Sequence, residues 1–134
     1  MSHWATKYIG LPYRPGGRDR GGLDCWGLLK LIYLEQRGIP LPDLLGVAEG
    51  SIAAISREIG RESKENWIEV PEPQDGCAVA MSKQDRLHHV GVWTDADGGK
   101  VIHAHHRKVV AETLRYLRME GFRTIKFFLY VVHC

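Results

Sequence analysis

One apolar segment constrains the fold of this 134-residue chain more than any other. Asp24 can cap a helix, and the residues after it carry Trp, Leu, Ile and Tyr side chains on nearly every helical face as far as Gln36 and Arg37. Gly38 then ends the helix. Because a helix that is apolar all round lies inside a domain, we expect this one in the middle of the protein, with Cys25 in its first turn.

The other helical signals also lie in the N-terminal half. A short helix fits the first ten residues, and the segment 11–22 is a loop rich in proline, glycine and arginine. A second amphipathic helix fits residues 51–61, where isoleucines recur at helical spacing. These patterns predict a helical first half interrupted by one long loop.

After Pro73 the composition changes to short runs of β-type residues. Residues 95–99 have the composition of a hairpin turn. Helices followed by strands predict an α+β fold, in a single domain over residues 1–134, with N-terminal helices packed on a C-terminal antiparallel sheet. The expected strands are 77–81, 89–93, 100–104, 109–113 and 124–132.

Composition excludes several function classes. The apolar content of 44% is ordinary for a globular protein, and a net charge of +2 does not indicate nucleic-acid binding. No run is long enough to insert in a membrane, and the first residues carry no targeting segment, so we expect a protein made in the cytoplasm. Three cysteines without a CxxC pair suit reduced thiols. Acids gather in residues 43–75 and bases in 107–126; we interpret these as solvated faces, an acidic substrate or partner surface being the alternative.

Cysteine and histidine residues carry the chemical signal. Cys25 opens a helix, where the macrodipole and backbone N–H groups favour the thiolate and could also stabilise an oxyanion. Gly27 would let a substrate backbone approach. His89 and His103 lie on successive expected strands, on faces that allow their rings to meet. This layout predicts a cysteine hydrolase with a nucleophile, a base and a group that orients the base.

Plainer interpretations exist for each residue. Most free cysteines are small buried hydrophobes, and a single histidine is more often structural than catalytic. His88 points to the opposite strand face from His89, so we expect it to be non-catalytic. The group His103, His105 and His106 invites a zinc interpretation, but no nearby acid or paired cysteine completes it, so we expect no metal and no cofactor.

Three sequence motifs carry a family resemblance. These are Tyr-Ile-Gly-Leu-Pro-Tyr-Arg-Pro-Gly-Gly at 8–17, Leu-Asp-Cys-Trp-Gly-Leu at 23–28, and His-Val-Gly-Val-Trp at 89–93 followed by Ile-His-Ala at 102–104. In order and spacing, over about residues 4–106, the chain resembles the NlpC/P60 family of papain-like cell-wall cysteine peptidases.

The resemblance implies a role for each site residue. Cys25 would be the nucleophile, His89 the general base and His103 the group that orients it. Tyr13 would be a pocket residue near the thiol. The substrate would be the peptide stem of peptidoglycan, cleaved between D-glutamate and the diamino acid.

Two residues beside the cysteine are further candidates for substrate binding. Asp24 precedes Cys25, and Trp26 stands where the family usually has serine. If the indole lined the groove, the enzyme would not need a free amino terminus on its substrate; the alternative is that Trp26 packs in the core. We include Asp24 and Trp26 with Tyr13 among the expected substrate contacts.

The chain resembles the phage-tail branch of the family in three respects: it has Trp26, it is small, and it shows no export signal. This implies a peptidase at the tail tip of a virion, bound to tail-tip or hub proteins and acting on the host cell wall. The alternative is a tail assembly protein that keeps the peptidase fold with little or no hydrolytic activity.

Overall fold

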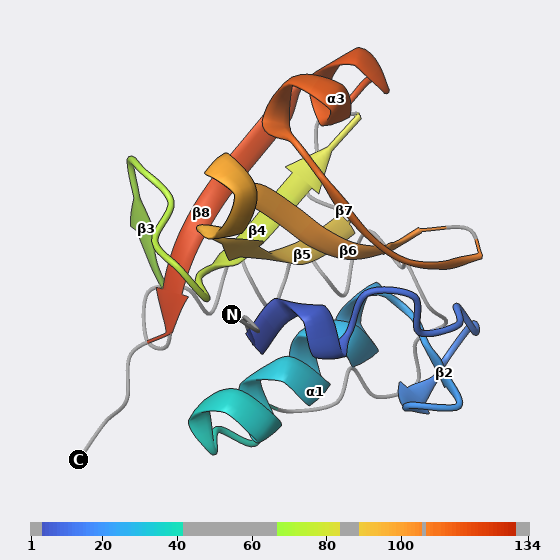
Figure 1. Cartoon of the computed structure of the whole chain (residues 1–134). Helices are drawn as coiled ribbons and strands as arrows, with labels where there is room; N and C mark the ends of the chain where they lie inside the picture. Colours follow the sequence, from blue (N-terminus) through green and yellow to red (C-terminus); the bar gives the residue numbers. More distant parts are fainter. Residues whose placement is uncertain (1–3, 42–66, 84–88, 106, 131–134) are drawn as a thin grey trace.

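The computed structural model describes residues 4–41, 67–83, 89–105 and 107–130. Within them, a sheet in which every strand pair is antiparallel has the order β3-β8-β4-β5-β6-β7, and α1 packs on one side of it (Figure 1). The predicted α+β fold is confirmed. The strands of this sheet are β3 (Trp67–Val70), β4 (Ala78–Ser82), β5 (His89–Thr94), β6 (Lys100–His105), β7 (Lys108–Glu112) and β8 (Thr124–Tyr130).

The remaining elements are short, apart from α1 (Cys25–Arg37). The 3-10 helix η1 (Trp4–Lys7) precedes the loop, and η4 (Ala96–Gly98) forms the turn between β5 and β6. The predicted hairpin turn at 95–99 is therefore present. Four elements were not predicted from the sequence: β3, the two-residue strands β1 (Arg18–Asp19) and β2 (Gly22–Leu23), and α3 (Leu114–Met119).

Two cores lie on opposite faces of the sheet. The helix-side core packs α1 against residues such as Val90, Val92 and Ile102. The far-side core is formed by Cys77, Val79, Met81, Trp93, Val101, Leu117, Phe122 and Phe127. Because side chains alternate along a strand, each residue of β5 and β6 faces one core or the other. Figure 1 shows α1 and α3 on the two sides of the sheet.

α1 is less central than its sequence predicts. Its first five residues are all buried, but beyond them only Ile32 and Tyr33 are, and Leu34 is 53% exposed. The second half of α1 therefore buries one stripe against the sheet rather than its whole surface. The ends are as predicted: Asp24 caps the first turn, and Gly38 ends the helix in the left-handed conformation at φ 68°.

Some expectations fall outside the described residues: the helix at 51–61, the end of the last strand at 131–132, and the side chains of His88 and His106. Among the residues that are described, no helix is long and apolar enough to cross a membrane.

Candidate active site

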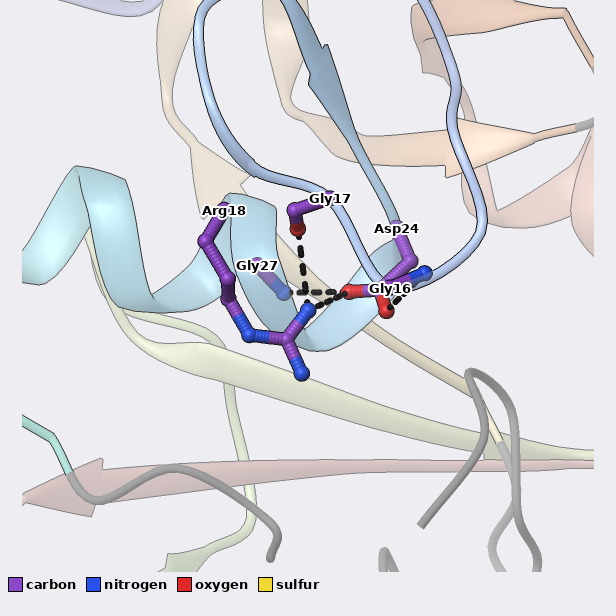
Figure 2. Close-up of polar contacts among 5 residues, drawn as sticks. All are labelled: Gly16, Gly17, Arg18, Asp24 and Gly27. Atoms are coloured by element: carbon purple, nitrogen blue, oxygen red, sulfur yellow. Dashed lines mark hydrogen bonds and ion pairs between the residues drawn. The ribbon is translucent and has the colours of Figure 1, made fainter. Parts of the chain in front are cut away.

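The start of α1 is held by one buried carboxylate. Asp24 is 1% exposed, and its Oδ1 accepts hydrogen bonds from the Gly27 amide at 2.7 Å and the Arg18 guanidinium at 2.7 Å. Its Oδ2 accepts from the Gly16 amide at 3.1 Å, and Arg18 also donates to the Gly17 carbonyl at 2.9 Å (Figure 2). The carboxylate therefore fixes both the loop and the helix end that carry Cys25. These contacts give Asp24 a structural role, and substrate binding by Asp24 stays a prediction.

Gly27 is also a structural requirement. A Cβ atom at this position would lie 2.1 Å from the Gly17 carbonyl oxygen. The glycine thus lets the loop pack directly on the first turn of α1. This internal contact explains the glycine without reference to a substrate.

Cys25 and Trp26 lie side by side in the sequence, and both are buried in the helix-side core. Cys25 is the first residue of α1 and is 1% exposed. Trp26 is 2% exposed and packs as a core side chain, because burying its large apolar surface stabilises the helix–sheet contact. This burial favours the core alternative for Trp26, and its contact with substrate stays a prediction.

The loop before α1 ties Cys25 to the hairpin that carries His103. The backbone of Tyr13 forms an isolated β-bridge with Leu23, two residues before the cysteine. The Tyr13 amide donates a hydrogen bond to the Arg107 carbonyl at 2.9 Å. The amide of Arg107 in turn donates to the His105 carbonyl at 2.7 Å. The start of α1 and the turn between β6 and β7 therefore lie at the same end of the molecule. The half-buried Tyr13 lies between them.

His89 and His103 meet as their strand faces predict. His89 Nε2 lies 2.8 Å from His103 Nδ1, and His103 Nε2 lies 2.6 Å from Glu112 Oε1. The His89 ring stacks on Phe122 with centroids 5.7 Å apart and an interplanar angle of 22°. Three polar side chains from β5, β6 and β7 therefore form a continuous hydrogen-bonded chain.

Burial keeps the middle of this chain neutral. His103 is fully buried, and loss of solvation lowers its pKa to about 4, against an opposing effect of the Glu120 carboxylate. Loss of solvation also raises the pKa of Glu112. The contact between His103 and Glu112 is thus a hydrogen bond from a neutral imidazole rather than an ion pair.

The rings of His89 and His103 project from the far-side face of the sheet, with Trp93 and Val101 as neighbours on that face. Cys25 belongs to the helix-side core. His89 is the first residue of β5, so its ring lies at the end of a strand. The structure thus brings both histidines together and places the cysteine near the same end of the sheet, on the α1 side.

Two contributors were missed by the sequence analysis. The sequence gives Glu112 no signal of its own, but the β6–β7 register pairs it with Val101 and so places it on the same face as His103. Alternation along the hairpin could have shown this. Arg18 had no sequence signal beyond its position in a basic loop.

Known proteins resemble this chain in sequence and in fold. The sequence matches the NlpC/P60 family over residues 10–124. Protein P54 of Enterococcus faecium is 30% identical over 105 residues, which span 75% of this chain and 16% of that protein. The crystal structure of the NlpC/p60 domain of the peptidoglycan hydrolase SagA has a TM-score of 0.61 and 25% identity, with 96% of this chain and 93% of that chain covered. This chain belongs to the NlpC/P60 family.

Proposed function

We propose that the domain is a cysteine peptidase that cleaves the peptide stem of peptidoglycan, with Cys25 as nucleophile and His89 as general base. The observation that carries the proposal is the hydrogen-bonded chain from Glu112 through His103 to His89. The Tyr13 and Arg107 contacts connect the start of α1 to the β6–β7 turn beside this chain. Cys25 stands at the amino end of a 13-residue helix, where the macrodipole favours a thiolate.

The hydrogen-bonded chain fixes which nitrogen of His89 acts as the base. Ionised Glu112 can only accept, so His103 donates from Nε2 and accepts at Nδ1. His89 must then donate from Nε2 to His103, which leaves its Nδ1 as the acceptor for the thiol proton. His103 and Glu112 act through His89 and are therefore positioning residues.

The reaction then follows the two steps of acyl transfer. Nδ1 of His89 takes the thiol proton, and the Cys25 thiolate attacks the peptide carbonyl carbon. As the C–N bond breaks, the imidazolium returns its proton to the leaving amine and a thioester remains. A water molecule, deprotonated by the same nitrogen, attacks the thioester, so the carboxylate is released and the thiol is restored.

The substrate class is supported by family membership and by SagA, a peptidoglycan hydrolase whose NlpC/p60 domain has a similar structure. We propose that the bond between D-glutamate and the diamino acid is cleaved. Delivery by a phage tail, with tail-tip proteins as partners, is part of the proposal and rests on Trp26 at the family's usual serine position. Since Trp26 is buried, it gives no basis for choosing between attached and free stems.

Mass analysis of products released from purified sacculi tests the proposal. The native protein should release stem fragments cut at one bond, and Cys25→Ala should release none. Comparing sacculi with the free tripeptide L-Ala-γ-D-Glu-diaminopimelate then separates a wall-opening enzyme from a recycling enzyme. Equal, negligible release by the native protein and Cys25→Ala would favour the tail assembly alternative.

A further inference from the structure

We propose that His89, His103 and His105 form a binding site for a zinc ion, and that zinc reversibly inhibits the peptidase. Zinc binding itself is independent of the proposed function, whereas the inhibition rests on it. In the sequence, His103 and His105 group with His106, and no acid or paired cysteine nearby completes a metal site. The pairing of β5 with β6 supplies His89 instead.

The three rings have the spacing of a three-histidine zinc site. One ring nitrogen from each lies within 4.8 Å of the others. The ring centroids are 5.0 Å apart for His89 and His103, 5.3 Å for His103 and His105, and 6.2 Å for His89 and His105. Imidazoles bound tetrahedrally at the usual Zn–N distance of about 2.0–2.1 Å have their ring centroids roughly 5 Å apart.

A small movement would admit the ion. His89 Nε2 and His103 Nδ1 are 2.8 Å apart, and two nitrogens on a tetrahedral zinc ion are about 3.3 Å apart. The pair must therefore open by about half an ångström, while a water molecule could take the fourth position. His89 and His105 are half-buried rather than enclosed, so solvent reaches this side of the cluster.

The surroundings favour a transition metal such as zinc over magnesium or calcium. Glu112 accepts from His103 Nε2, which directs Nδ1 toward the ion, as in the carboxylate–histidine–zinc arrangement of many metal sites. Glu120 acts electrostatically on both His103 and Glu112, so a cation finds negative charge nearby. Three imidazole nitrogens suit zinc, whereas magnesium and calcium prefer oxygen ligands.

Zinc in this position would stop the proposed reaction. The metal would bind the two nitrogens that form the His89–His103 hydrogen bond. That hydrogen bond would be lost, and it is the contact that fixes the His89 tautomer. His105 has no part in the proposed catalytic chain, so replacing it separates the two functions.

Zinc titration of the purified chain against a chromophoric chelator tests the site. We expect one ion per chain, an affinity at least about 100-fold weaker for His105→Asn, and unchanged affinity for Cys25→Ala. Cobalt(II) should give tetrahedral visible bands without a thiolate charge-transfer band. No binding, binding that survives His105→Asn, or binding lost in Cys25→Ala would overturn the site. If His105→Asn fails to fold by thermal melting, His105→Gln replaces it.

Sacculus hydrolysis provides the second measurement. Zinc at a concentration that fills the site should inhibit the native protein, a chelator should restore activity, and His105→Asn should be active and resistant to zinc. Inhibition that is equal in the native protein and His105→Asn would overturn the regulatory claim. A native protein that binds zinc but never cleaves sacculi would overturn the proposed function and leave the metal site standing.

Discussion

The start of α1 and the histidine chain both use a buried polar residue, but to different ends. At α1, the Asp24 carboxylate receives two backbone amides and the Arg18 guanidinium, so its interactions hold the chain in place. In the histidine chain, one hydrogen bond with Glu112 orients His103, and a second hydrogen bond, with His103, orients His89. The first arrangement fixes a backbone and the second fixes proton positions. Changes in the first should therefore alter stability, and changes in the second should alter turnover.

The largest effect is expected in the histidine chain. His89→Ala should lower sacculus hydrolysis about 10²- to 10⁴-fold, because the general base is lost, with little change in thermal unfolding. His103→Ala should lower it less, and His103→Asn less again, because the third group need only accept a hydrogen bond. His88→Ala is the matched control and should be nearly neutral. An inactive His88→Ala beside an active His89→Ala would refute the strand-face assignment.

Asp24→Ala should show the opposite behaviour. We expect a loss of about 2–3 kcal/mol in the free energy of unfolding, because the helix cap disappears and buried amides lose their acceptor. Chemical denaturation measures the change. Asp19→Ala is the control, since the exposed Asp19 carboxylate accepts from the Gly21 amide within its own loop and its removal should change stability by less than about 0.5 kcal/mol. Equal stability of the two variants would show that the cap does not hold α1.

Glu112→Gln should have the smallest effect on turnover. An amide keeps the shape of the side chain but can present either an oxygen or an NH₂ group to His103, so the tautomer is less firmly fixed. We expect kcat to fall about tenfold with KM unchanged, as for other outer partners of a functional histidine. Nitrogen-15 NMR of the imidazoles should show a mixed His103 tautomer. Native kcat together with a native tautomer would remove Glu112 from the proposed chain.

Sequence reasoning succeeded where the pattern is local. The apolar run after Asp24, the turn at 95–99 and the alternation around His89 and His103 each reflect rules that act within a few residues. It failed where the outcome depends on distant partners. The burial of Trp26 and the contact of Gly27 with Gly17 could not be predicted, because tertiary contacts set how the 11–22 loop and the sheet pack against α1. Glu112 was missed because its role depends on a hairpin register.

Alkylation of Cys25 tests the central claim, that this thiol acts with His89, most directly. Brief iodoacetamide treatment at a series of pH values, followed by peptide mapping, measures Cys25 and Cys77 in one sample. Burial raises the pKa of the Cys77 thiol, so Cys77 should react slowly until the pH is well above the ordinary pKa of a cysteine. Cys77 therefore serves as an internal reference. We predict that Cys25 reacts near neutral pH and well before Cys77 in the native protein, and that His89→Ala moves its reaction to higher pH. Equal labelling of both thiols, or a Cys25 profile unchanged by His89→Ala, would contradict the account.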